Sequence, residues 1–304
     1  MTFDEACKLT NDQARDYLEK LRWDGQPFCA HCGCLEVTKL NGKATRPGVY
    51  KCRGCRKQFT VTVGTIFEDS HIELRQWVMA FCLVCSSKKG ISAHQLYRML
   101  GLGSYKSAWH MAHRIRHAMS KEPLKGLLTG VVESDETWVG GVKRGMGQAY
   151  THNKTAVQAL IQRGGSMRAR AIGRVTPVNL KESLAEYVDT DATLHTDDWK
   201  GYKVIARRFK KHETVNHTAG EYARDDVHVN SCESYFALLK RGVHGTFHHV
   251  GKQHLQRYCD EFAFRWNHRE TTDAERTEAA LRLAPGCRLT FNPLGAKTGI
   301  RLAD

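Results

Sequence analysis

Two cysteine pairs constrain the fold of this 304-residue chain more tightly than any other feature. Cys29 and Cys32 form one CxxC pair, Cys52 and Cys55 form another, and nineteen residues separate Cys32 from Cys52. Each pair can bend into a knuckle that directs two thiolates at one ion, and two knuckles complete a tetrahedral zinc shell. Because four thiolates leave no open coordination position, the spacing predicts one structural zinc ion and not a catalytic one.

Short strand-like segments accompany the two pairs. They predict strands at residues 37–40, 48–51 and 58–63, so we expect a zinc ribbon over residues 25–66. His31 and Cys34 are alternative ligands in the same segment.

A third CxxC pair, Cys82 and Cys85, lies in an apolar run of nine residues that begins at Trp77. This setting predicts a buried helix in which cysteine acts as a small hydrophobic residue. The run is too short to span a bilayer, and the acidic, polar N-terminus is unlike a secretory signal. Reduced CxxC pairs without such a signal favour a cytoplasmic protein, associated with the nucleoid if it binds DNA.

The chain carries 46 Lys and Arg against 32 Asp and Glu, a formal net charge of +14. The excess is spread along the sequence and not confined to a tail. Folded basic proteins of this kind most often bind polyanions. The alternative is an enzyme whose basic charge is incidental.

Residues 91–119 have the pattern of a helix-turn-helix. Ser92 can cap a first helix, Gly101 and Gly103 favour a turn, and Ser104 can cap a second helix. A basic, aromatic-bearing second helix can enter the DNA major groove, although two ordinary packed helices give the same pattern. His113 and His117 are expected on the exposed side of this second helix. Five other residues are expected on that side and in contact with DNA: Tyr105, Lys106, His110, Arg114 and Arg116.

Residues 121–130 contain Pro123, Gly126 and Gly130 without clear periodicity, so we place a domain boundary there. Beyond it the predicted order is strand, strand, strand, helix, strand, helix, strand, helix, which indicates an α/β fold with a mixed sheet. The expected divisions are an N-terminal helix (1–24), the zinc ribbon (25–66), a helical helix-turn-helix-like segment (67–122), an α/β domain (128–270) and a C-terminal extension (271–304).

Three acidic residues in the α/β segment are candidates for one shared site. Asp135 lies within the first predicted strand, Asp197 just after the fourth, and Glu233 on the helix after the fifth. Neighbouring strands and a helix laid across them can bring the three carboxylates together. Clustered carboxylates repel one another unless cations neutralise them, and oxygen ligands favour Mg²⁺ or Mn²⁺.

Glu233 belongs to the stretch from His228 to His249, which has a helical apolar stripe. Glu233 and Lys240 are seven residues apart, about two turns, and so share a helix face. Gly242 and Gly245 are expected to end the helix. Taken alone, the pair also fits a solvated face of an amphipathic helix.

Three motifs together resemble the bacterial insertion-sequence transposases that carry an N-terminal zinc ribbon and an ISXO-like DDE catalytic domain. These motifs are residues 133–141, residues 196–202 and the stretch from Asn230 to His249. Thirty-five residues separate Asp197 from Glu233, a spacing shared with many such enzymes. The resemblance extends from about Phe28 to Arg269.

The resemblance implies an RNase H-like fold, binding to the terminal inverted repeats and to target DNA, and metal-dependent strand cleavage and transfer. Asp135, Asp197 and Glu233 would hold two Mg²⁺ or Mn²⁺ ions. Lys240, with Arg241 beside it, would contact a phosphate near the cut. Family members act in synaptic assemblies, so a homodimer or larger oligomer on DNA is expected.

The identity of the third catalytic residue stays open between Glu233 and Asn230, since some relatives carry asparagine there. We favour Glu233 because a carboxylate offsets the cation charge, whereas an amide offers only a neutral oxygen. Asn230 is expected to cap the helix instead. At the other two positions, Asp135 and Asp197 are preferred over their acidic neighbours Glu136 and Asp198.

Two other functions fit the same sequence. One is a domesticated or inactive transposase that binds DNA as a repressor. The other is a structure-specific nuclease that cleaves DNA and does not join it.

Overall fold

The structure is a computed structural model that describes residues 1–122, 126–141, 154–216, 219–221 and 223–290. The chain divides into two compact units. Among the described residues, the ribbon unit comprises residues 1–122 and 270–290, and the sheet unit lies between residues 123 and 269. No helix in these described ranges is long and apolar enough to cross a membrane.

The ribbon unit begins with α1 (Phe3–Lys8) and α2 (Asn11–Trp23). Thr10 and Gln13 form the capping box of α2. Three short antiparallel strands follow: β1 (Val37–Lys39), β2 (Tyr50–Cys52) and β3 (Gln58–Phe59). Trp23 of α2 packs edge-on against Tyr50, with ring centroids 5.1 Å apart, so α2 supports the small sheet.

Four further helices complete the ribbon unit: α3 (Leu74–Ser86), α4 (Ala93–Met99), α5 (Tyr105–Met119) and α10 (Asp273–Arg282). Cys82 and Cys85 are buried in α3, which confirms that this third pair is part of the core. The last helix, α10, packs against α2, α3 and α5. The chain therefore returns to the ribbon unit after it has formed the sheet unit.

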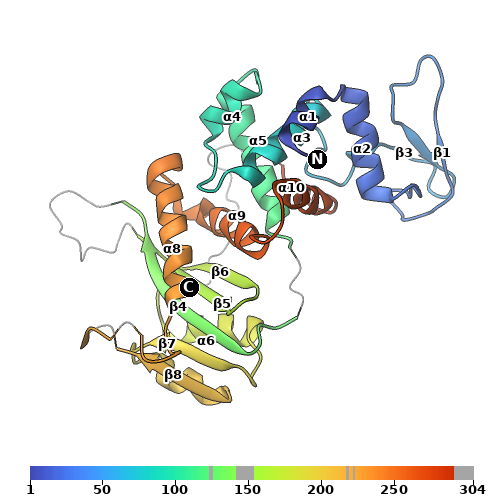
Figure 1. Cartoon of the computed structure of the whole chain (residues 1–304). Coiled ribbons are helices and arrows are strands. Elements are labelled where there is room, and N and C mark those ends of the chain that lie inside the picture. Colours follow the sequence, from blue (N-terminus) through green and yellow to red (C-terminus); the bar gives the residue numbers. More distant parts are fainter. Residues whose placement is uncertain (123–125, 142–153, 217–218, 222, 291–304) are drawn as a thin grey trace. The chain divides into compact units, whose positions relative to one another are not determined.

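The sheet unit contains five strands in the order β6-β5-β4-β7-β8 (Figure 1). The strands are β4 (Val131–Val139), β5 (Thr155–Gln162), β6 (Met167–Ile172), β7 (Thr193–Asp197) and β8 (Lys211–Val215). β5 runs antiparallel to β4 and β6, whereas β7 runs parallel to β4 and β8. This mixed sheet confirms the fold class expected from the sequence, an α/β arrangement of RNase H-like type.

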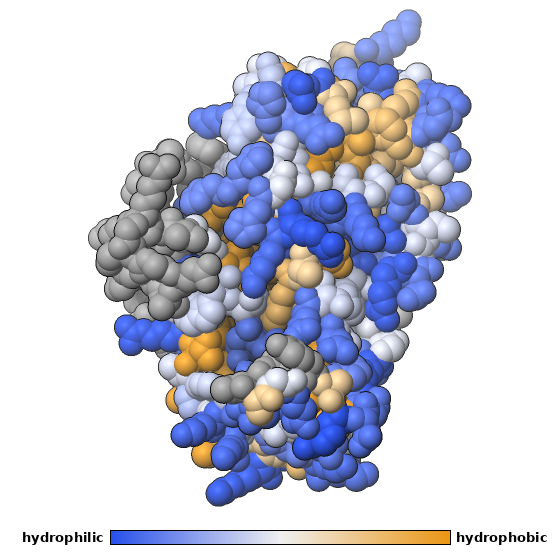
Figure 2. Space-filling model, turned by 60° about the vertical axis from the view of Figure 1, so that its left-hand side comes forward, coloured by the Kyte–Doolittle hydropathy of each residue, from blue (hydrophilic) through white to orange (hydrophobic). Residues whose placement is uncertain are grey.

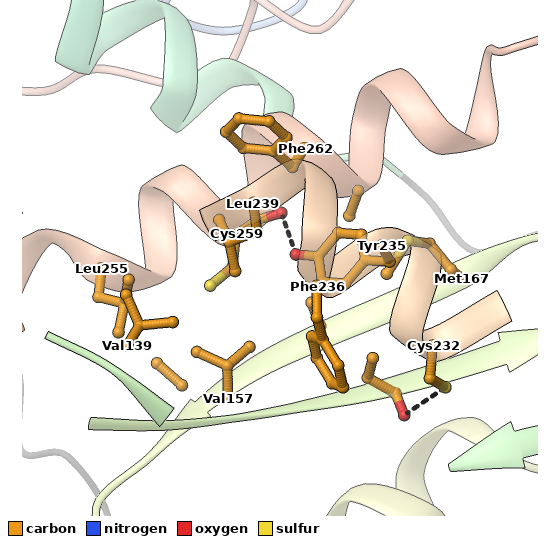
Figure 3. Close-up of a cluster of buried hydrophobic side chains, with 14 of the residues drawn as sticks. Val139, Val157, Met167, Cys232, Tyr235, Phe236, Leu239, Leu255, Cys259 and Phe262 are labelled. Atoms are coloured by element: carbon orange, nitrogen blue, oxygen red, sulfur yellow. Dashed lines mark hydrogen bonds between the residues drawn. The ribbon is translucent and has the colours of Figure 1, made fainter. Parts of the chain in front are cut away.

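Helices cover both faces of the sheet. One face packs against α6 (Pro177–Tyr187) and the short α7 (Tyr202–Ile205), which continues as the 3-10 helix η1 (Ala206–Arg208). The other face packs against α8 (Asn230–Gly242) and α9 (Leu255–Asn267), joined by η3 (Val243–Phe247) and η4 (Lys252–His254). Figure 3 shows Tyr235, Phe236 and Leu239 of α8 directed into this second core.

The structure corrects one helix boundary. Gly242 and Gly245 were expected to end α8, but both glycines are helical, and a π-helical segment carries the helix on to Phe247. The chain turns only at His248, where φ is +59°. Glycine is permissive and does not by itself stop a helix whose apolar face stays packed.

Hydrophilic residues predominate on the face shown in Figure 2, and smaller apolar areas interrupt them. This agrees with a chain in which 26% of the residues are charged.

Candidate active site and metal-binding residues

The four cysteines of the ribbon converge. The sulfur atoms of Cys29, Cys32, Cys52 and Cys55 all lie within 4.8 Å of one another, with Cys29 to Cys55 at 3.6 Å and Cys32 to Cys52 at 3.7 Å. A tetrahedron with Zn–S bonds of about 2.3 Å separates its sulfur atoms by roughly 3.8 Å. The donor set and its spacing therefore fit one Zn²⁺, and neither His31 nor Cys34 belongs to the set.

We expect metal analysis of the purified protein to find about one zinc per chain. Cys52→Ser removes one of four thiolates, so it should lose most of the zinc and destabilise the ribbon. Cys34→Ser is the matched control, because this thiol belongs to the same segment but lies outside the ligand set, and it should keep the metal. Full zinc content in Cys52→Ser would contradict the assignment.

The helix-turn-helix pattern also forms as predicted. Ser92 Oγ accepts the Gln95 N–H at 3.1 Å and caps α4, and Ser104 Oγ accepts the Ser107 N–H at 3.1 Å and caps α5. Gly101, in the connecting turn, has φ +60°, a conformation that glycine tolerates. The exposed start of α5 carries Tyr105 and Lys106, whereas His110 further along is half-buried.

Two of the predicted DNA-contacting residues are inside the protein. Arg114 is 8% exposed, and its Nη1 donates to the backbone oxygens of Ile66 and Glu68 at 2.8 and 2.9 Å. Arg116 is 2% exposed, and His113 is buried as well. The prediction that Arg114 and Arg116 contact DNA is therefore wrong. The second half of α5 is buried on more sides than its polarity pattern suggests. Arg114 tolerates this burial because backbone carbonyls inside the unit accept its hydrogen bonds.

Asp135 and Asp197 lie at the same level of two neighbouring strands. β4 and β7 are paired in parallel with Glu133 opposite His195, and each aspartate lies two residues further along its strand. Residues two apart on a strand point to the same face, and adjacent strands are about 5 Å apart. The register thus places both carboxylates side by side on the face that α8 covers.

Glu136 points the other way. Its carboxylate accepts a hydrogen bond from the Tyr202 hydroxyl, which itself lies 2.7 Å from Ser134 Oγ on the opposite face of β4. Burial raises the pKa of Glu136 to about 8, and the charges of Asp135 and Asp197 act in the same direction. This contact links the residue after Asp135 to α7. Glu136 is thus directed away from the face of the two aspartates, while Asp198, beyond the end of β7, is exposed.

The first turn of α8 lies over the strand beside Asp135. Cys232 is buried and donates to the backbone oxygen of Ala159, which is the residue paired with Asp135 across β4 and β5 (Figure 3). Burial raises the pKa of the Cys232 thiol well above its usual range, and Asp135 and Glu233 are among the carboxylates that add to this effect. Glu233 itself is exposed. Both acids therefore lie near the same thiol.

The remaining predicted residues are also on α8. Asn230 is the first residue of the helix and is exposed, and Lys240 is half-buried two turns after Glu233. Arg241 is exposed, and its Nε donates to the backbone oxygen of Ala237 at 3.0 Å. The expectation that Asn230 caps α8 is wrong, because the N-cap is Val229 and makes no side-chain hydrogen bond.

A divalent cation fits the chemistry of this face, since carboxylate oxygens are the ligands that Mg²⁺ and Mn²⁺ prefer. Throughout the described part of the chain, the four cysteines are the one group of three or more ligand residues whose ligand atoms lie within 4.8 Å of one another. The three acids are thus less tightly gathered than the cysteines. Asp135 and Asp197 lie at the same level of neighbouring strands, and Glu233 offers a carboxylate from α8.

A set of polar residues beside the acids was not expected from the sequence. Glu133 is fully buried although it carries a carboxylate, and it bonds to Arg163 and to the start of α8. One signal was present in the sequence: Glu133 precedes Asp135 by two residues and so lies on the same strand face. Its partner Arg163 follows β5 directly and had no distinguishing pattern.

Comparisons with known proteins match both parts of the chain to transposase families. Residues 127–267 match the ISXO2-like transposase domain, and residues 9–58 match the transposase zinc-ribbon domain. A relative from Halobacterium salinarum, described as an uncharacterized protein in transposable element ISH50, is 28% identical over 276 residues. The alignment covers 84% of this chain and 91% of the relative.

Proposed function

Because the chain belongs to the insertion-sequence transposases that combine a zinc ribbon with an ISXO2-like domain, we propose that it binds the terminal inverted repeats of its element and catalyses metal-dependent strand cleavage and strand transfer. One observation carries the catalytic part of this proposal. Asp135 and Asp197 lie at one level of two parallel strands, beneath the helix that carries Glu233.

The roles of the residues follow from their positions. Asp135 and Asp197 would hold the cations from the sheet, and Glu233 would complete the ligand set from α8. Two Mg²⁺ or Mn²⁺ ions there would activate the attacking oxygen and stabilise the leaving oxygen of an in-line phosphoryl displacement. Lys240, two turns along α8, offers a cation to a phosphate next to the cut, and Arg241 extends the basic end of the helix.

The proposed reaction has two steps. Water first attacks the phosphodiester at the element end, and the departing 3′ oxygen leaves as a hydroxyl. That hydroxyl then attacks a phosphodiester of the target, where one P–O bond forms as another breaks. Joining therefore requires neither an added energy source nor a covalent bond between the protein and DNA.

Binding to the element end is assigned to the ribbon and to the start of α5. Tyr105 and Lys106 are exposed there, and an exposed helix start next to a tight turn is the part of a helix-turn-helix that reaches DNA. His110 is half-buried and lies further from that end. We expect the active species on DNA to be a homodimer or larger assembly.

Lys106→Ala should weaken binding to all DNA sequences and lower the salt dependence of the binding constant by about one unit of slope, because one phosphate contact is lost. Arg114→Met is the informative contrast. It should leave that slope unchanged but cost roughly 2 kcal/mol of stability, since bonds from a buried cation to backbone carbonyls are removed. Salt titrations of binding and denaturant unfolding measure the two quantities. An unchanged slope in Lys106→Ala would remove this residue from the interface.

The proposed activity is tested by incubating the protein with labelled element ends, a target plasmid and Mg²⁺. Labelled ends joined to the plasmid support the proposal. Cleaved ends without joining would indicate a nuclease, and binding without either product would indicate a repressor.

A further inference from the structure

A single arginine contacts both strands that carry the aspartates and the segment that leads into α8. Arg163 follows β5, and its Nε donates to the Glu133 carboxylate of β4 at 2.7 Å. Its Nη2 lies 3.3 Å from His195 Nδ1 on β7, and donates to the backbone oxygen of His228 at 3.1 Å. Its Nη1 pairs with the Asp226 carboxylate at 2.9 Å and donates to the Asp226 backbone oxygen. The guanidinium therefore holds two strands and the segment that leads into α8.

Glu133 extends this network to the helix itself. One oxygen of its carboxylate accepts the backbone N–H of Ser231 at 2.8 Å, and the other accepts the Ser231 hydroxyl at 3.0 Å. The N-cap residue, Val229, provides no side-chain hydrogen bond. A buried carboxylate from β4 thus satisfies the start of α8, where the positive end of the helix dipole favours negative charge.

The network is in register with the three acids. Each acid follows a member of the network by two residues, the pairs being Glu133 and Asp135, His195 and Asp197, and Ser231 and Glu233. On the two strands this offset puts the network on the same face as the aspartates. On α8, Ser231 and Glu233 both belong to the first turn of the helix.

We propose that the buried Glu133–Arg163 pair is a positioning device, which fixes the first turn of α8 and with it Glu233 over Asp135 and Asp197. The inference rests on the proposed function, because it takes these acids as the metal ligands. Glu133 is fully buried, so its charge depends for compensation on Arg163, on the hydrogen bonds from Ser231 and on the His228 ring, whose Nδ1 lies 3.4 Å from the carboxylate. Loss of this compensation releases the start of α8, while the apolar stripe still holds the rest of the helix.

Glu133→Gln is the primary variant, since glutamine keeps the size of the side chain and removes its charge. Arg163→Lys is the milder second variant, since it retains a cation beside Glu133 but gives up the branched contacts to His195 and to residues 226–228. Glu261→Gln is the matched control. Glu261 is also fully buried and also paired with an arginine, Arg265, but the pair lies within α9.

Two measurements that do not depend on catalysis decide the question. The first is hydrogen exchange along α8, and the second is Mn²⁺ binding to the full chain, followed by electron paramagnetic resonance of the free ion. In Glu133→Gln the amides of residues 230–234 should lose protection while later turns of α8 keep it. Mn²⁺ affinity should fall about tenfold, the usual effect of losing a group that orients metal ligands.

The Glu261→Gln control should show that a general loss of stability does not cause the changes seen in Glu133→Gln. Glu261→Gln should keep Mn²⁺ affinity within about twofold, well below the tenfold effect of an orienting group, and should leave the first turn of α8 protected. Arg163→Lys should reproduce both changes in smaller size, which keeps the test valid if Glu133→Gln does not fold.

Unchanged protection of residues 230–234, or unchanged Mn²⁺ affinity, in a folded Glu133→Gln protein overturns this inference alone. The Asp135→Asn protein separates that result from failure of the proposed function. If Mn²⁺ binding by the wild-type chain does not depend on Asp135, the proposed metal site is wrong, and the inference falls with it.

Discussion

Asp135→Asn and Asp197→Asn are each expected to abolish metal-dependent strand cleavage while leaving binding to the element end intact. Both residues lie on the face of the sheet covered by α8, at one level of β4 and β7. An amide keeps the shape of the side chain but loses the charge that holds the cations. Metal stabilisation of a phosphoryl displacement is worth several kcal/mol, so the loss in rate should reach roughly 10³-fold or more.

The acidic neighbours provide matched controls for this experiment. Glu136→Gln changes a carboxyl that accepts a hydrogen bond from Tyr202 on the opposite face of β4, and Asp198→Asn changes an exposed residue beyond the end of β7. Both should retain most of the cleavage rate, although Glu136→Gln should lose some stability through the Tyr202 contact. Single-turnover cleavage of a labelled element end measures all four variants. If Glu136→Gln or Asp198→Asn is the inactive member of its pair, the wrong carboxylate has been chosen at that position.

Glu233→Gln is the second substitution from which a large effect is expected. Glu233 is exposed on α8. Its charge and that of Asp135 both raise the pKa of the Cys232 thiol. Replacement of Glu233 should eliminate Mg²⁺-dependent cleavage with little change in the free energy of unfolding, because exposed positions usually contribute less than about 0.5 kcal/mol. Cleavage and denaturant unfolding should be measured on the same preparation.

Asn230→Ala is the matched variant on the same helix. Asn230 is also exposed, and it does not form the cap that was expected of it, so its loss should likewise cost less than about 0.5 kcal/mol. It should retain activity within a few-fold of the wild type. An active Glu233→Gln protein beside a folded but inactive Asn230→Ala protein would transfer the third catalytic position to Asn230.

Local patterns were enough to predict much of this fold. The sequence places Asp135 within a strand, and that strand forms as β4 (Val131–Val139). The spacing of Cys29, Cys32, Cys52 and Cys55 predicts the set of thiols that the structure brings together. In each case the relevant signal lies within a few residues or in a fixed ligand spacing. The acids could be proposed, but only the register of β4 with β7 places Asp135 beside Asp197.

The wrong predictions for Arg114 and Asn230 have a common cause. In both cases the local structure depends on residues far away in the sequence. Arg114 was expected on the surface because arginine is usually exposed, but residues 66, 68 and 289 supply backbone oxygens that bind its guanidinium inside the ribbon unit. Asn230 was expected to cap α8, yet Glu133, nearly a hundred residues earlier, binds the start of that helix. Such partners cannot be read from the sequence around either residue.

The most direct test of the catalytic assignment is anomalous diffraction from crystals soaked in Mn²⁺, measured at the manganese absorption edge. We expect a manganese peak bound by the carboxylates of both Asp135 and Asp197, on the side of the sheet covered by α8. That peak should be absent from crystals of Asp135→Asn. Manganese bound by Glu136 or Asp198 instead, or no manganese at Asp135 and Asp197 in a protein that cleaves DNA with Mn²⁺, would contradict it.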